Sequence, residues 1–416
     1  MSEPAESDTS MRALLRQGDF VRFWLSRWTA VLGVQIQSVA LGWHVYSLAR
    51  ETMDVPRAAF MVSLIGLVSF VPVLLLALPA GETADRYDRR TILKFTYAGE
   101  IAIAAMLMVA TLTGNDSIPL LLGAAFLFGV CRAFFAPANT AMGPMLVPRA
   151  LLPRAIAWNS LAWQTASIAG PALGGVLVAW STGMSYAAAL VFYIIAGLTI
   201  LLIRSNTKPE VQPGSRWALM KEGLVYVWTN KIVFGAISLD LAAVILAGAT
   251  AMLPVYARDV LHVGPEGFGI LRAAPAIGAA AMAFYLAAVP IRSKAGVIMF
   301  VSVGIFCVGT VVFGASKVMW LSVTALVILG AADMISVYIR QTLIQLVTPD
   351  HMRGRVATVS SLFIGASNEL GEFRGGVIAR FIGPVAAVVW GGVGALVITG
   401  LWARLFPDLR KADRLA

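Results

Sequence analysis

The sequence predicts an all-α integral membrane protein whose twelve transmembrane helices form two six-helix halves. Of its 416 residues, 59% are hydrophobic and 13% are charged, whereas a soluble domain has about a quarter charged residues. The apolar residues gather in long runs, such as 58–78 and 385–401. A bilayer core needs about 20 apolar residues per helix. Because backbone polar groups in lipid must be satisfied within the segment, we expect these runs to be helices.

We expect the twelve spans to be connected by loops that alternate in basic character. The spans cover residues 23–48, 58–79, 91–112, 118–138, 156–180, 186–203, 232–254, 267–289, 297–315, 318–339, 357–379 and 385–404. The basic set of loops and termini holds Arg12, Arg16, Arg22, Arg86, Arg89, Arg90, Lys94, Arg149, Arg154, Arg204, Lys208, Arg216, Lys221, Lys231, Arg292, Lys294, Arg340, Arg353, Arg355, Arg404, Arg410, Lys411 and Arg414. The opposite set holds only Arg50, Arg57, Arg258, Lys317 and Arg380. The positive-inside rule then places both termini in the cytoplasm. We expect a multi-pass protein of the cell (inner) membrane.

These boundaries divide the chain into five parts. They are a cytoplasmic N-terminal segment (1–22), a first six-helix half (23–203), a central cytoplasmic loop (204–231), a second half (232–405) and a cytoplasmic tail (406–416). Residues 1–10 are polar and acidic, so the N-terminus does not resemble a cleaved signal. The net charge of +10 follows from this topology. We therefore expect a lipid bilayer as partner and no nucleic acid.

The central loop is expected to contain an amphipathic helix. Trp217, Met220, Leu224 and Trp228 recur at helical spacing among basic residues. Such a pattern is typical of a helix that lies on the membrane surface. Proline and glycine breakers between positions 209 and 214 precede it.

The two halves resemble each other at one fixed offset. Residues 146–161 align with 347–362 without a gap, so that Pro148 matches Pro349, 201 positions later. The same offset aligns 170–176 with 371–377. Internal repeats of this kind are typical of secondary transporters.

The segment after the second span carries a specific signature. It reads G-E-T-A-D-R-Y-D-R-R and contains Gly81, Asp85, Arg86, Arg89 and Arg90. This pattern resembles the signature loop of the major facilitator superfamily, although Thr83 and Asp88 replace the family's usual Leu and Gly. The resemblance implies a cytoplasmic gate in which Asp85 pairs with an arginine or a helix N-terminus of the other half. A solvated positive-inside loop is the alternative interpretation.

The fifth span carries a second motif. Gly170, Pro171, Gly174 and Gly175 follow Ala166 in the order A-x-x-x-G-P-x-x-G-G. The motif is similar to that of the superfamily's drug/proton antiporters, with Ala166 in place of the first glycine. Close helix packing alone also explains small residues at this spacing.

Ionisable residues inside spans are costly and are functional candidates by default. We expect a coupling network formed by Arg132, Asp240, Asp333, Glu369, Glu372 and Arg374. Glu369 and Glu372 share a helix face, and two nearby carboxylates raise each other's proton affinity. A structural ion-pair network is the alternative. Arg27 and Glu100 are interpreted as side chains that reach toward the cytoplasmic interface.

Several stretches resemble the branch of the superfamily that includes enterobactin-type siderophore exporters and macrolide-type efflux proteins. They are Phe23 to Arg27, the 84–90 segment, and 345–349 with Arg353 to Arg355. The resemblance implies a secondary transporter that exports a small molecule (a siderophore, drug or amphipathic metabolite) by proton antiport and alternating access. An uptake permease, a lipid-type flippase and a non-transporting receptor remain alternatives.

Other chemistry finds no support in the sequence. The chain has no P-loop and neither an H-E-x-x-H nor a G-x-S-x-G pattern, so we expect neither a primary pump nor an enzyme. Cys131 and Cys307 are interpreted as buried hydrophobes, and the three histidines are isolated. We expect no metal and no cofactor, and a monomer whose partners are a small-molecule substrate and protons.

Overall fold

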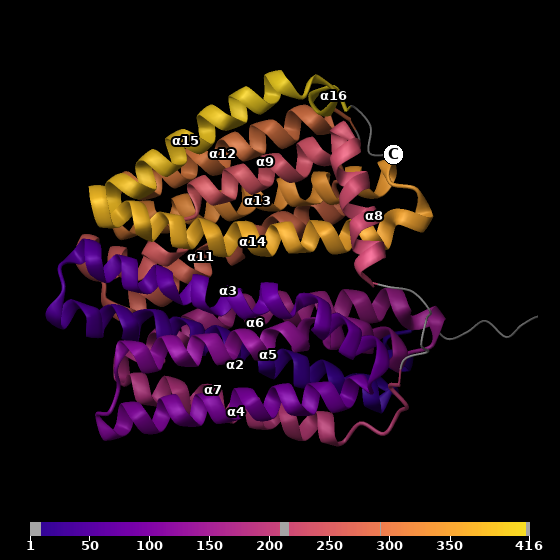
Figure 1. The fold of residues 1–416 in the computed structure, drawn as a ribbon, viewed down its shortest axis with the longest axis horizontal. Helices are drawn as coiled ribbons and strands as arrows, with labels where there is room; N and C mark the ends of the chain where they lie inside the picture. The colour runs from indigo at the N-terminus through magenta and orange to yellow at the C-terminus, as the bar shows by residue number, and fades with distance from the viewer. Residues whose placement is uncertain (1–9, 209–215, 292, 413–416) are drawn as a thin grey trace, which may run out of the picture. The chain divides into compact units, whose positions relative to one another are not determined.

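The computed structural model describes residues 10–208, 216–291 and 293–412 (Figure 1). Every regular element in these ranges is a helix, which confirms the predicted all-α class. Contacts between residues group the chain into two compact units: unit 1 comprises residues 1–40 and 71–213, and unit 2 comprises 41–70 and 214–416. The hairpin between the first two long helices therefore clusters with the second half of the sequence. The predicted breakers at 209–214 and the first nine residues lie outside the described residues.

Unit 1 consists of long helices in the order of the first six predicted spans. It contains α1 (Met11–Leu15), the first part of α2 (Gly18–Thr52), the second part of α3 (Val55–Arg86), α4 (Arg89–Thr113), α5 (Ile118–Met142), α6 (Leu152–Trp180) and α7 (Thr182–Leu201). Two short 3-10 turns, Gly143–Leu146 and Arg149–Leu151, connect α5 to α6. Helix α4 contacts both α5 and α7.

The ends of α4 follow from its sequence. The Asp88 side chain accepts a hydrogen bond from the backbone N–H of Arg90 and thereby caps the first turn. At the other end, Gly114 adopts the left-handed conformation (φ 68°) that terminates many helices. Between these two ends, α4 is held in place by the packing of its buried face on α7.

Unit 2 contains the remaining helices and the α2–α3 hairpin. They are α8 (Arg216–Thr229), α9 (Lys231–Ala247), α10 (Leu253–Val255), α11 (Gly264–Ala288), α12 (Ala295–Ala315), α13 (Met319–Val347), α14 (Asp350–Ile382), α15 (Pro384–Leu405) and α16 (Pro407–Arg410). Helix α13 packs on both α11 and α12, and α9 packs on α14 and α15.

The seventh predicted span, 232–254, corresponds to one candidate membrane span, Lys231–Val260, but this span is not one continuous α-helix. Helix α9 ends at Ala247, and a 3-10 turn (Thr250–Met252), α10 and a π-helix (Tyr256–Val260) follow. Pro254 has no backbone N–H to donate, and its ring would clash with the carbonyl four residues earlier. Gly248 follows α9 directly and marks the break.

Ten helical segments in the described part of the chain are long and apolar enough to cross a membrane by length and composition. The two other predicted spans coincide with α2, of 35 residues, and α14, of 33 residues. The predicted twelve-helix architecture is therefore consistent with the structure. The helices exceed the predicted spans at most ends, and α13 continues to Val347 rather than stopping at residue 339.

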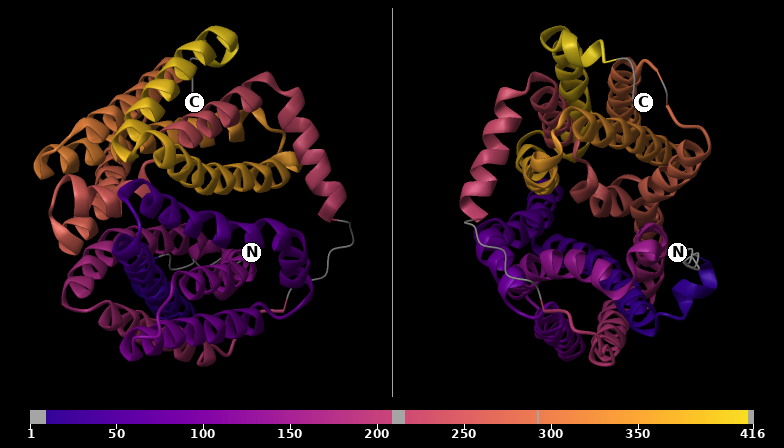
Figure 2. Two further views of the ribbon diagram at one scale, coloured as in Figure 1. Left: turned by 60° about the vertical axis from the view of Figure 1, so that its left-hand side comes forward. Right: turned by 90° about the vertical axis from the view of Figure 1, so that its right-hand side faces the viewer.

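The central amphipathic helix is confirmed as a helix, α8. It contacts α14 and crosses it steeply (Figure 2). The Tyr226 hydroxyl donates to the carbonyl of Val347 at 2.9 Å, and Arg355 forms an ion pair with Glu222. A Cβ on Gly223 would lie 2.9 Å from the Arg355 carbonyl oxygen. Its location on the membrane surface stays a prediction, and the side chain of Trp217 lies outside the described residues.

Helices recur at the offset seen in the sequence. Helices α5 and α13 begin at Ile118 and Met319, which are 201 positions apart. The next two pairs, α6 with α14 and α7 with α15, end or begin at nearly the same spacing. The sequence repeat therefore corresponds to equivalent helices in the two halves.

Candidate functional site

The signature segment is mostly helical rather than a loop. Residues 81–86 form the last turns of α3, and only Tyr87 and Asp88 separate α3 from α4. Gly81 is buried, Asp85 is partly buried and Arg86 is exposed. The expected contact of Asp85 with the other half stays a prediction.

Two arginines of the motif bind within unit 1. Arg90 donates from Nε to the carbonyl of Ile200 at 3.2 Å and from Nη2 to that of Leu201 at 2.6 Å. Both carbonyls belong to the last turn of α7, where backbone acceptors lack helical partners and a cation is favoured. Arg89 donates its backbone N–H to Thr207 at 3.4 Å. These contacts connect the α3–α4 junction to the end of the first half.

Asp88 has a role that sequence reasoning missed. Its carboxylate caps α4, accepts from the Thr91 hydroxyl at 3.2 Å and accepts a further hydrogen bond from the Thr207 hydroxyl. The sequence comparison treated this residue as a departure from the family pattern. The signal was present, because an aspartate directly before the first residue of a helix is a typical N-cap.

The glycine motif of α6 packs this helix on α2. A Cβ on Gly170 would lie 2.5 Å from Cβ of Gln35, and one on Gly174 would lie 3.2 Å from Cα of Ile36. Pro171 and Gly175 are buried in the same helix. The motif residues therefore form a close packing contact between α6 and α2 within unit 1.

A buried ion pair lies at the centre of unit 2. Asp240 of α9 and Arg340 of α13 form a salt bridge, and their side chains are 11% and 3% exposed. Sequence reasoning assigned Arg340 to a cytoplasmic loop, which is wrong because α13 continues for seven residues beyond it. The spacing held a signal: Arg340 lies two turns after Asp333, so the two share a helix face.

Asp333 belongs to the same cluster. It is electrostatically coupled to Asp240 and to Arg340. The cluster therefore holds two carboxylates and one guanidinium, and one carboxylate more than the arginine can neutralise. Of the predicted network, the structure brings Asp240 and Asp333 together and adds Arg340.

Glu369 and Glu372 approach one point on α3 within unit 2. A Cβ on Gly66 would lie 3.0 Å from Oε2 of Glu369 and 3.4 Å from Oε2 of Glu372. The predicted shared face of the two carboxylates is thus observed, directed at the α3 backbone. Arg374, two residues on, donates from Nη1 to the carbonyl of Leu246 at 2.5 Å, in the last turn of α9.

A second polar cluster joins α2 to the π-helix of unit 2. The Tyr46 hydroxyl donates to Asp259 at 2.5 Å, and Nη2 of Arg50 lies 3.1 Å from the other oxygen of that carboxylate. Sequence reasoning missed this contact, since Arg50 and Asp259 are far apart in the chain and no periodicity relates them. It fixes the end of α2 to the segment that follows the break in α9.

In unit 1, the structure corrects the interpretation of Glu100. The residue lies in the middle of α4 and is 2% exposed, so its side chain does not reach an interface. Arg132 of α5 acts on it electrostatically and is itself exposed. The carboxylate on which Arg132 acts here, Glu100, is one that the predicted network did not include.

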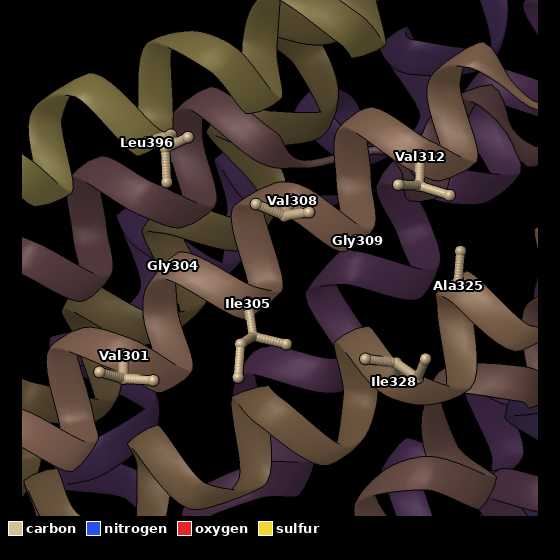
Figure 3. Close-up of a pocket in the computed structure, with 9 residues that line it drawn as sticks. All are labelled: Val301, Gly304, Ile305, Val308, Gly309, Val312, Ala325, Ile328 and Leu396. Atoms are coloured by element: carbon tan, nitrogen blue, oxygen red, sulfur yellow. The ribbon is translucent and has the colours of Figure 1, made fainter.

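A groove on unit 2 is entirely apolar. It has a volume of about 370 Å³ and lies between α12 and α13, with Leu396 of α15 at one side (Figure 3). Aliphatic side chains and two glycines line it, so it offers nothing to a charged or hydrogen-bonding ligand. Within the described residues, no group of three His, Cys, Asp or Glu side chains could hold a metal ion.

A family model described as "transmembrane secretion effector" matches residues 9–415. The chain belongs to this family. The family lies within the major facilitator superfamily, as the signature segment predicted. The family and its relatives are membrane transporters rather than enzymes.

Two relatives align over nearly the whole chain. An enterobactin exporter of Citrobacter koseri is 27% identical over 404 residues, which cover 94% of this chain and 92% of that exporter. A multidrug efflux pump of Mycobacterium tuberculosis, Tap, is 27% identical over 402 residues, 92% of each chain. The predicted branch resemblance is therefore confirmed.

Solved structures share the fold. A bacterial homologue of the iron transporter ferroportin, in an inward-facing state, matches with a TM-score of 0.71 at 16% identity, covering 95% of this chain and 99% of that one. A D-xylose-proton symporter matches with a TM-score of 0.65 at 12% identity, covering 96% and 99%. These similarities establish the major facilitator fold.

Proposed function

We propose that the protein exports a small molecule from the cytoplasm by proton antiport, through alternating access between its two halves. The observation that carries this proposal is the buried Asp240–Arg340–Asp333 cluster. A cluster with surplus negative charge in a membrane span can bind and release a proton at modest cost. The two exporters described above support the direction of transport.

The cycle begins with the ion pair. Protonation of Asp240 or Asp333 neutralises the surplus carboxylate, and this changes which oxygen Arg340 binds. Because α9 and α13 carry these groups, a change in their pairing alters the fit between the two helices. The substrate binds near the midplane of the membrane, as in other carriers built from repeats. Siderophores, drugs and amphipathic metabolites are the candidate substrates.

The signature segment forms the gate on the cytoplasmic side. Asp85 and Arg86 at the end of α3 hold that side closed while the substrate site faces outward. Arg89, Arg90 and Asp88 keep this end of α3 fixed to α7 and Thr207, so the segment moves with its half as a rigid body. We further propose that both termini are cytoplasmic, that the protein is an inner-membrane monomer, and that residues 23–203 and 232–405 are the moving halves.

The test uses purified protein in liposomes with ethidium and a catecholate siderophore as probes. Asp333→Asn, Glu369→Gln, Glu372→Gln and the double variant Asp240→Asn/Arg340→Gln are compared with the wild type. A coupling residue should lose proton-driven efflux at least tenfold while counterflow without a gradient persists. Glu266→Gln, an exposed carboxylate of α11, is the matched control. If all four variants lose both activities or neither, the assignment of these residues is wrong.

A further inference from the structure

Helix α4 carries a carboxylate in the middle of its buried face. Leu93, Tyr97, Ala104 and Leu107 follow one another at steps of three, four or seven residues and are at most 1% exposed. Glu100 occupies the central position of this stripe and is 2% exposed. Residues at this spacing lie on one face of a helix, so Glu100 occupies a core position where an apolar side chain would be expected.

The surroundings of Glu100 are tightly packed. A Cβ on Gly99 would lie 2.7 Å from Sγ of Cys131, so α4 and α5 cross closely beside the carboxylate. From α7, a Cβ on Gly197 would lie 3.6 Å from Cδ1 of Ile101. Oε2 of Glu100 and the hydroxyl of Tyr193 are both buried without a hydrogen-bond partner. Burial of an ionised carboxylate here would cost far more than burial of the neutral acid.

Titratable groups approach this position from each helix packed around it. Helix α5 contributes Cys131 and Arg132, α7 contributes Tyr193 and α4 itself contributes Tyr97, while Arg27 of α2 acts on Tyr97. The Ser26 hydroxyl donates to the carbonyl of Ala196 at 2.9 Å and lies 3.1 Å from the Tyr97 hydroxyl. Arg132 is the cation that acts on Glu100. Arg132 is exposed, so its side chain is accessible from outside the packed helices.

We propose that Glu100 is a second proton-binding site, located in unit 1 and controlled by Arg132. The carboxyl group holds a proton while α4, α5 and α7 are packed as described. When Arg132 moves closer or water enters, the O–H bond breaks, its electron pair stays on the carboxylate and the proton passes to water. This inference rests on the proposed proton antiport, and it gives each half of the carrier its own proton site.

Infrared spectroscopy of the purified protein tests the proposal without any transported substrate. A protonated carboxyl group has a carbonyl stretching band that an ionised carboxylate lacks. We expect such a band at neutral pH, and we expect Glu100→Gln to remove it while Glu266→Gln leaves it unchanged. Arg132→Gln should raise the pH at which the band disappears by about one unit, because it removes the charge that favours ionisation. This second measurement needs no change at Glu100.

The outcomes separate the two proposals. If Glu100→Gln leaves the band unchanged, or Arg132→Gln leaves its titration unchanged, the Glu100 site is refuted. In liposomes, Glu100→Gln should keep ethidium counterflow and lose proton-driven efflux at least tenfold. Retention of driven efflux would make Glu100 a structural acid and would also refute the site. Absence of driven transport in the wild type would instead refute the proposed antiport, while the infrared titration would still decide whether Glu100 binds the proton.

Discussion

Helices α6 and α14 occupy equivalent places in the two halves, and they share glycines but not charges. Helix α6 packs closely on α2 through Gly170 and Gly174. Helix α14 packs closely on the C-terminal end of α9 through Gly371 and Gly375. A Cβ on Gly371 would lie 2.7 Å from the carbonyl oxygen of Val244, and one on Gly375 would lie 3.3 Å from that of Gly248. In both halves, glycines at equivalent positions therefore allow two helices to approach closely.

The residues between the glycines differ in kind. Helix α6 has Pro171 and Leu173, where α14 has Glu372 and Arg374. Arg374 donates to a carbonyl at the end of α9, just before the break that α2 does not have. A cation is favoured at a helix C-terminus, so this charge supports the broken helix. The two helices therefore share glycines that allow close packing, and α14 alone of the two carries charges at these positions, one of them bound to the end of the interrupted helix.

Helices α5 and α13 also differ in charge at equivalent positions. At the same offset, Arg132 of α5 corresponds to Asp333 of α13, and Asn139 corresponds to Arg340. In unit 2, the changed residues build the ion pair with Asp240. In unit 1, Asn139 is buried and its Oδ1 has no hydrogen-bond partner. At this position α13 thus carries an arginine in an ion pair, where α5 carries a neutral amide.

The largest effect is expected from breaking the ion pair of the second half. Asp240→Asn should lower the free energy of unfolding by about 3–5 kcal/mol, because it removes the carboxylate that forms a salt bridge with the buried Arg340. The double variant Asp240→Asn/Arg340→Asn places at position 340 the residue type found in α5 and should recover most of this loss. Thermal unfolding in detergent measures both. A double variant no more stable than the single one would show that the pair is not the coupled unit described here.

A smaller loss of stability, similar in both halves, is expected when the glycines at these helix-packing contacts are replaced. Gly170→Ala and Gly371→Ala should each cost about 1–3 kcal/mol, since the added methyl group forces the paired helices apart. Gly123→Ala in α5 and Gly400→Ala in α15 are matched controls, because nothing lies within 4 Å of a Cβ at either position. The controls should be neutral or slightly stabilising. Melting temperatures test the comparison, which fails if one of these contacts tolerates alanine as well as its control does.

The sequence predicted the helices well because bilayer burial imposes long apolar runs that few other structures produce. It did not predict the break after Ala247, because residues 248–260 remain apolar enough to continue a span. The sequence identified Asp240 and Asp333 as candidates because charged residues inside a membrane span are energetically costly. It did not identify Arg340, because a basic residue near the end of a predicted span is usually assigned to the adjacent loop. It also misjudged Glu100, whose burial depends on which face of α4 packs on α7. Contacts between distant helices decide such roles, and periodicity within one helix cannot report them.

The last segment of each half is anchored differently, and this difference predicts the smallest effect. In unit 1, Asp19 accepts hydrogen bonds from the backbone N–H groups of Arg204 and Ser205, at 3.1 and 2.8 Å. In unit 2, the anchor is a backbone hydrogen bond from Gly296 to Ala412 at 2.9 Å. Partial burial acts to raise the pKa of Asp19, but the hydrogen bonds, chiefly from Ser205, outweigh it and lower the pKa from 3.8 to about 2.

Because the pKa of Asp19 is lower in the folded protein, its ionised carboxylate stabilises the folded state at pH values above 3.8. This stabilisation is lost as the pH falls from 3.8 toward the lowered pKa of about 2. Below pH about 4, hydrogen exchange at Arg204 and Ser205 should therefore accelerate relative to the intrinsic rate. Exchange at Gly296 should not, because its partner carbonyl does not titrate. Asp19→Asn should show the faster exchange already at neutral pH and lose the acid dependence. Equal acid sensitivity of the two anchors would mean that a wider loosening of the protein, rather than protonation of Asp19, controls this end of the first half.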